Sequence, residues 1–122
     1  MSGSISRWSK VSEATITAAG TNSSAIRQHD AAWGSYEIPS GSGITSITLE
    51  IGYDTSNKKN SASVSTWSPL KDENNVLIGS IAVTAGEYYN FPSAFFNSEF
   101  GRIVALSAVG GSDVVIPVFL KG

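Results

Sequence analysis

The feature that most constrains this chain is a series of short segments in which apolar and polar residues alternate. The clearest is ITSITLEI, residues 44–51, where Ile47, Leu49 and Ile51 fall on one face and Ser46, Thr48 and Glu50 on the other. Alternation with a period of two predicts a β-strand with one buried and one solvated face. Alternation recurs at residues 13–19 and 61–67, and further segments that we expect to be strands lie at residues 24–28, 33–38, 76–83, 88–91, 102–109 and 114–120.

Turn-forming residues separate these segments. Residues 39–43, PSGSG, combine a proline with two glycines and therefore predict a turn. Residues 110–113, GGSD, predict a hairpin that joins the last two strands. Pro117 cannot donate a hydrogen bond to a neighbouring strand, so we expect the last strand to lie at a sheet edge or to carry a bulge there.

These patterns predict an all-β fold. About eight short strands with glycine- and asparagine-rich turns are typical of an antiparallel β-sandwich or barrel, and no segment has the pattern of an amphipathic helix. A chain of 122 residues fits one domain. We assign residues 13–122 to a single β-sandwich domain and residues 1–12, which are serine-rich, to a flexible N-terminal arm. If this arm orders on a partner, Trp8 is its expected anchor.

Composition and charge exclude several classes of partner. The net charge is −2 and the basic residues are scattered, whereas a nucleic-acid-binding protein needs a basic stripe, so we expect no nucleic-acid partner. No apolar run approaches the roughly 20 residues of a membrane span, so we expect no membrane partner. The N-terminus lacks the apolar stretch of a secretory signal. Charged residues make up only 15% of the chain, which suggests that a protein partner covers part of the surface.

We also expect no catalytic, cofactor or metal site. The single histidine, His29, has Asp30 beside it in the sequence, but no nucleophile motif accompanies them. The acidic residues are spread along the chain, and no carboxylate pair with glycosidase spacing is apparent. Residues 72–75, DENN, carry oxygen ligands suited to calcium but lack the ligand spacing of an EF-hand, and a type I turn explains them more simply. The chain is therefore predicted not to be an enzyme, and there is no cysteine for thiol or disulfide chemistry.

The aromatic residues leave an alternative function open. Trp33, Tyr36 and Trp67 are candidates for a row of exposed rings that binds sugars, as in a carbohydrate-binding β-sandwich. Core packing and subunit interfaces are the more common uses of such side chains.

Four sequence elements carry a resemblance to a known family. They are Thr66–Asp72 (TWSPLKD), Thr84–Tyr88 (TAGEY), Pro92–Phe96 (PSAFF) and Arg102–Ser107 (RIVALS). Together they resemble the tailed-bacteriophage capsid decoration, or cement, proteins, and the resemblance covers about two-thirds of the chain.

The resemblance implies a jelly-roll-like β-sandwich on the outer surface of a phage capsid. Such a protein is made in the host bacterial cytoplasm, stabilises the virion by bridging subunits of the major capsid protein, and forms a homodimer or homotrimer. The expected contact residues are Trp8 in the arm and Phe95, Phe96 and Phe100, which we place on an exposed aromatic loop. The alternatives are the carbohydrate-binding module and a phage tail or baseplate accessory protein with the same fold.

Overall fold

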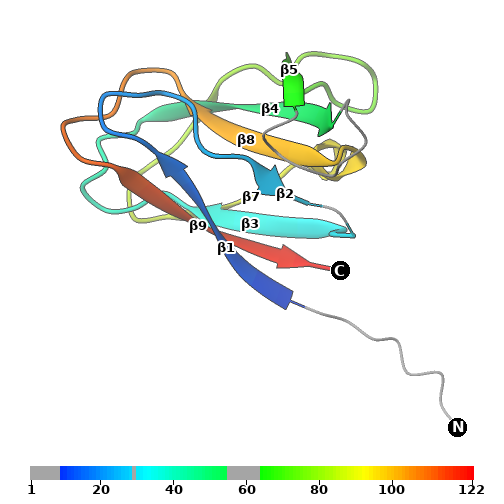
Figure 1. Ribbon diagram of the computed structural model, residues 1–122, viewed down its shortest axis with the longest axis horizontal. Coiled ribbons are helices and arrows are strands. Elements are labelled where there is room, and N and C mark those ends of the chain that lie inside the picture. Colours follow the sequence, from blue (N-terminus) through cyan, green and yellow to red (C-terminus); the bar gives the residue numbers. More distant parts are fainter. Residues whose placement is uncertain (1–8, 29, 55–63) are drawn as a thin grey trace, which may run out of the picture.

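The computed structural model describes residues 9–28, 30–54 and 64–122, in which two antiparallel sheets pack face to face (Figure 1). The four-stranded sheet has the order β1 (Ser9–Ile16), β9 (Val114–Lys121), β3 (Trp33–Glu37), β7 (Tyr88–Asn90). The five-stranded sheet has the order β2 (Ile26–Arg27), β8 (Phe100–Ala105), β4 (Ser46–Asp54), β5 (Val64–Pro69), and β6 (Ile81–Ala82) also pairs with β4. The predicted all-β sandwich is confirmed.

The strand order is that of a jelly roll. The pairs are nested along the chain, because β1 pairs with β9, β2 with β8, β3 with β7, and β4 with β5 and β6. The chain therefore behaves as one long hairpin that is folded over on itself. Additional pairing of β9 with β3 and of β8 with β4 joins the turns of this hairpin into two continuous sheets.

The core lies between the two sheets and consists of the inward-facing residues of the alternating segments. Ile47 and Leu49 of β4 are at most 1% exposed, as their alternation predicts, whereas Ile51 is partly buried. From the opposite sheet, β9 contributes Ile116 and Val118, both fully buried. Each such side chain stabilises the fold by about 1.5–3 kcal/mol relative to an exposed position.

The predicted hairpin at residues 110–113 is wrong, because β8 and β9 belong to different sheets. The connection between them crosses from one layer to the other and bonds to the turn after β1. The Ala19 N–H donates to the Gly110 carbonyl at 2.9 Å, and the Val109 N–H donates to the Gly20 carbonyl at 2.9 Å. Glycine-rich sequences permit a tight turn, but sheet partners are chosen by long-range pairing that local turn chemistry does not specify.

The expectation for Pro117 is also wrong, because β9 is an inner strand between β1 and β3 and its register with β1 runs unbroken through Glu13 and Pro117. Its pairing with β3 ends at the Tyr36–Val118 pair, one residue short of Pro117. The proline is tolerated because β3 makes no ladder pair at its level.

Strand β1 begins earlier than the sequence pattern predicts. Residues 9–12, which we placed in the arm, pair with β9 in a register that runs from Ser9–Lys121 to Ser12–Val118. Trp8 and the rest of the arm lie outside the described residues.

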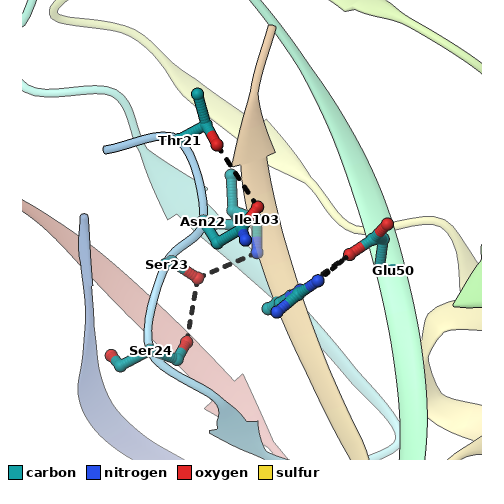
Figure 2. Close-up of polar contacts among 7 residues, drawn as sticks. Thr21, Asn22, Ser23, Ser24, Glu50 and Ile103 are labelled. Carbon is teal, nitrogen blue, oxygen red and sulfur yellow. Dashed lines mark hydrogen bonds and ion pairs between the residues drawn. The ribbon is translucent and has the colours of Figure 1, made fainter. Parts of the chain in front are cut away.

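Residues 22–24 link the two sheets along one side of the sandwich. On the side of β8, the Ile103 N–H donates to Ser23 Oγ at 2.9 Å, and Ser23 Oγ donates to the Ser24 carbonyl at 2.8 Å (Figure 2). On the side of β1, the Thr15 N–H donates to Ser24 Oγ at 3.0 Å, and Ile16 forms a bridge with Ser23. This segment therefore pairs with the outer edge of β1 at its C-terminal end.

Candidate interaction surface

The largest gathering of exposed apolar side chains lies on the outer face of the four-stranded sheet. Within the described residues, eight large hydrophobic side chains are exposed, and four of them lie on this face: Val11, Trp33, Tyr88 and Val115, at 68, 55, 62 and 42% exposure. We use "outer face" for the residues of this sheet that point away from the core: Ser9, Val11, Glu13, Thr15, Trp33, Ser35, Glu37, Tyr88, Asn90, Val115, Pro117, Phe119 and Lys121.

The strand register arranges the outer face in rows across the strands. One row holds Ser9, Lys121 and Trp33, and the next holds Val11, Phe119, Ser35 and Asn90. A third row contains Glu13, Pro117, Glu37 and Tyr88. Glu13 is opposite Pro117, and Glu37 is opposite Tyr88. Glu37 lies at the level of Pro117 because the preceding residue of β3, Tyr36, is opposite Val118. The last row is Thr15 and Val115.

Aromatic rings dominate the centre of this face. The rings of Tyr88 and Phe119 have centroids 5.7 Å apart with an interplanar angle of 41°. The small Ser35 lies on β3 between their two strands, which leaves room for this contact. The Lys121 ammonium lies 5.0 Å from the centre of the Trp33 ring, a cation–π contact that occupies one side of the indole.

Strand β9 is apolar on both of its faces. Its inward residues are aliphatic, and its outward residues include Val115, Pro117 and Phe119. A strand with one solvated face alternates apolar and polar residues, whereas a continuous apolar run is typical of a strand covered on both sides. This run, VVIPVFL, was the sequence signal for the outer face, and the prediction of site residues did not use it.

A second exposed apolar surface is the tip of the hairpin after β5, residues 71–77, which we call the hairpin tip. Val76 and Leu77 are 58% and 55% exposed. Asp72 Oδ1 accepts the N–H groups of Asn74 at 2.8 Å and Val76 at 3.0 Å, and the Asp72 N–H donates to the Val76 carbonyl at 2.8 Å. These bonds hold the tip in one conformation. Asp72 thus has the role of a turn residue, and no group of three or more potential metal ligands occurs in the described parts of the chain.

The structure corrects the exposure expected for the aromatic loop. Phe95 is 0% exposed and Phe96 is partly buried, because the loop folds into a 3-10 turn, η2 (Ser93–Asn97), that directs Phe95 into the core. There Phe95 stacks on Phe91 with parallel rings 4.4 Å apart and meets Phe96 edge-on at 5.6 Å.

Phe100 is likewise not on a loop. It is the first residue of β8, opposite Arg27 and Gly52, and is 1% exposed. Neither Phe95 nor Phe100 presents a surface to a partner.

The three residues considered for sugar binding do not share a face. Trp33 lies on the outer face of the four-stranded sheet, whereas Tyr36 of the same strand is 1% exposed and packs against Phe91 at 4.7 Å. Burial, together with the neighbouring Tyr89, raises the pKa of Tyr36 to about 12. Trp67 lies on the five-stranded sheet and is partly buried. The expected row of exposed aromatic residues is therefore wrong for this trio.

Trp67 belongs to a polar cluster on the five-stranded sheet. The Arg102 guanidinium lies 4.5 Å from the centre of the Trp67 ring and pairs with Glu50 Oε1 at 2.6–2.7 Å. Gly52, opposite Trp67, leaves room for the side chains of β5, because a Cβ there would lie 2.5 Å from Val64 Cγ1 and 3.3 Å from the Trp67 ring. The cluster joins β4, β5 and β8 and serves the fold.

Two open pockets have volumes of about 340 and 360 Å³. The first lies between residues 39–42 and 110–115, and its one carboxylate, Asp113, accepts the Ala18 N–H at 2.8 Å. The second is bounded by the hairpin tip and η2, where Ser93 donates to Glu73 at 3.0 Å. In both pockets, the lining carboxylates accept hydrogen bonds that hold loops in place. His29 lies outside the described residues.

Within the described residues, no helix is long and apolar enough to cross a membrane.

Comparison with known proteins gives a similarity of fold. No protein-family model and no curated protein matches this chain. The solved structure of YomS, a protein derived from the SPBc2 prophage, superposes with a TM-score of 0.56 at 15% identity, over 98% of this chain and all of that one. A structure of Bacillus endospore appendages, which form disulfide-linked pili, gives a TM-score of 0.42 at 14% identity over 98% of this chain and 89% of that one.

Proposed function

We propose that this chain is a non-enzymatic structural protein of a tailed-phage virion, which decorates the outer surface of the capsid and bridges subunits of the major capsid protein. It is made in the host bacterial cytoplasm and added to the particle. The fold that it shares with a prophage-derived protein of the same extent supports a phage origin. The four sequence elements that resemble capsid decoration proteins support the more specific role.

The observation that carries the proposal is that exposed apolar side chains gather on two separate surfaces. One is the outer face, built on β1, β3, β7 and β9, and the other is the hairpin tip with Val76 and Leu77. A protein that bridges subunits needs at least two contacts, and two such surfaces supply them if one binds the capsid and the other joins two copies that are bound to different subunits. Bridging stabilises an assembled shell because each additional attachment is intramolecular and therefore occurs at a high effective concentration.

We assign the capsid contact to the hairpin tip. Its two apolar side chains project from a turn that Asp72 already holds in one conformation, so little conformational entropy is lost when a partner covers them. Trp8 stays a second proposed capsid contact, on the arm. Phe95 and Phe100 are withdrawn because both are buried.

The test is binding to purified phage heads that lack this protein. We expect the wild-type chain to saturate the heads, to appear on their outer surface by electron cryo-microscopy, and to raise the temperature at which they release DNA. The double variant Val76→Ser/Leu77→Ser should bind at least about tenfold more weakly, since each residue loses an apolar contact of about 1 kcal/mol or more. Leu106→Ser, which removes an exposed leucine outside both surfaces, is the matched control.

The arm is tested separately by deleting residues 1–8 only, since residues 9–12 belong to β1. A loss of head binding with an unchanged unfolding midpoint supports the contact at Trp8. Binding of the wild-type chain to purified tails but not to heads would replace the decoration role by the tail or baseplate alternative. Binding to neither would overturn the proposal.

A further inference from the structure

We propose that the outer face of the four-stranded sheet binds the same face of a second copy of this chain, forming a symmetric dimer in which Lys121 of each copy lies against Glu13 and Glu37 of the other. This inference concerns the outer face alone. It does not depend on the capsid, because the capsid contact is assigned to the hairpin tip.

The exposed apolar side chains of the outer face lie on several strands, so a partner that covers them has to contact several strands. Val11, Val115, Pro117 and Phe119 lie on the adjacent strands β1 and β9, and Tyr88 extends the patch to β7 through its ring contact with Phe119. Contiguous exposed apolar surface of this kind marks an interaction site in soluble proteins. A flat sheet face is matched in shape by another sheet face, as in the packing of two sheets in a sandwich.

The charges identify the occupant as a second copy. Along β9, Lys121 lies two residues from Phe119 on one side, and Pro117 lies two residues from it on the other side. Pro117 is opposite Glu13 and at the level of Glu37. The positive row and the negative row are thus equidistant from the row that contains Phe119.

A two-fold axis turns this arrangement into charge pairing. If the axis lies between two facing sheets and crosses their strands at the level of Phe119, the Lys121 row of one copy faces the Pro117 row of the other. Each Lys121 then meets the partner's Glu13 and Glu37, and each Trp33 faces the partner's Tyr88 row. A symmetric dimer needs a surface that is complementary to itself, and the outer face has this property in both charge and apolar pattern.

A sugar fits the outer face less well. Sugar rings stack on the flat faces of aromatic side chains, but one side of Trp33 is already occupied by the Lys121 ammonium at 5.0 Å. The aliphatic residues Val11, Val115 and Pro117 have no use in such a site.

The dimer predicts an energetic coupling that a monomer cannot produce. Lys121 and Pro117 are four residues apart on β9, roughly 13 Å, so Lys121 is remote from Glu13 and Glu37 within one chain. Mutations at such distances are normally additive. Any rescue between them therefore reports a contact between copies.

The experiment is sedimentation equilibrium of the purified full chain from about 1 to about 500 µM. We expect a monomer–dimer equilibrium for the wild type. Lys121→Glu alone, and Glu13→Lys/Glu37→Lys together, should each weaken the dimer at least tenfold, because like charges then face each other. The triple swap, which combines all three substitutions, should restore the wild-type dissociation constant to within about threefold. Val11→Asn should weaken the dimer, and Leu106→Ser should not.

Three results would overturn the inference. They are a wild-type monomer at every concentration, a triple swap as weak as its parents, and a loss of dimer in Leu106→Ser equal to that in Val11→Asn. A monomer whose tryptophan fluorescence is quenched by a glycan would assign the face to sugar binding instead. Binding of Lys121→Glu to phage heads in parallel separates this inference from the capsid role, since that variant retains the hairpin tip.

Discussion

Gly101 of β8 faces the ring of Phe95 so closely that a Cβ at this position would overlap the ring. Phe95 belongs to η2, which follows β7 of one sheet, whereas β8 belongs to the other. The missing side chain at Gly101 therefore gives Phe95 its place between the sheets. This contact explains why the aromatic loop is part of the core.

Gly101→Ala should destabilise the domain by about 1–3 kcal/mol, because the added methyl group overpacks a site that is already filled. The measurement is chemical denaturation followed by tryptophan fluorescence. Gly110→Ala is the matched control, since a Cβ there meets no atom within 4 Å, and its effect should stay within about 0.5 kcal/mol. Equal effects of the two substitutions would show that backbone freedom, and not the Phe95 ring, decides the cost at Gly101.

Local alternation was sufficient to predict the fold class, because a period of two is imposed on every half-buried strand whatever its partners are. It located Ile47 and Leu49 in the core correctly. It did not predict which strands share a sheet. The glycine-rich connection at residues 110–113 has the composition of a hairpin, yet it crosses between layers, because pairing is set by contacts far apart in the sequence.

Gln28 is the other residue that holds η2. It is 1% exposed, and its Nε2 donates to the Phe95 carbonyl and to Ser98 Oγ, the latter at 2.7 Å. Gln28→Leu keeps a similar volume but removes the donor from these buried acceptors, so we expect a loss of about 1–3 kcal/mol in unfolding free energy. Hydrogen exchange of the amides in residues 93–98 should be faster in the variant than in the wild type, and this increase should be larger than the increase in β4. A variant as stable as the wild type would mean that the acceptors find other donors.

The candidate surface was harder to predict than the fold. Aromatic residues in an irregular segment resemble an exposed loop, but Phe95 is buried because a 3-10 turn directs it into the core. Such a short turn has no periodic pattern in the sequence that would predict it. The outer face did leave a signal in the continuous apolar run of β9. Its meaning depends on knowing that β9 has one face in the core and one outside, which only the three-dimensional arrangement provides.

Arg102 should contribute to stability through its contacts with Trp67 and Glu50. Arg102→Met retains most of the apolar stem but loses the charge, and we expect it to destabilise the domain by about 1 kcal/mol, since both contacts are only partly screened by solvent. The difference from the wild type should shrink as salt is raised to about 1 M. Arg27→Met, at an exposed position of β2, is the control and should change little. A salt-independent difference would assign the effect to the packing of the guanidinium against the Trp67 ring and not to its charge.

Tyr36 makes the stability of the domain depend on pH in the alkaline range. Burial, with a smaller contribution from Tyr89, raises its pKa from 10.0 to about 12 in the folded protein. Above pH 10 the unfolded chain releases the Tyr36 proton while the folded chain still holds it, so unfolding is favoured. The stability that Tyr36 contributes is therefore complete below pH 10 and is lost as the pH rises toward 12, by up to about 2–3 kcal/mol. Tyr36→Phe retains the ring contacts but cannot ionise, so the unfolding free energy of the variant minus that of the wild type should increase by up to about 2–3 kcal/mol from pH 10 to pH 12. Urea denaturation of both proteins at intervals across this range measures the difference. Parallel curves would mean that solvent reaches the Tyr36 hydroxyl and that its pKa is ordinary.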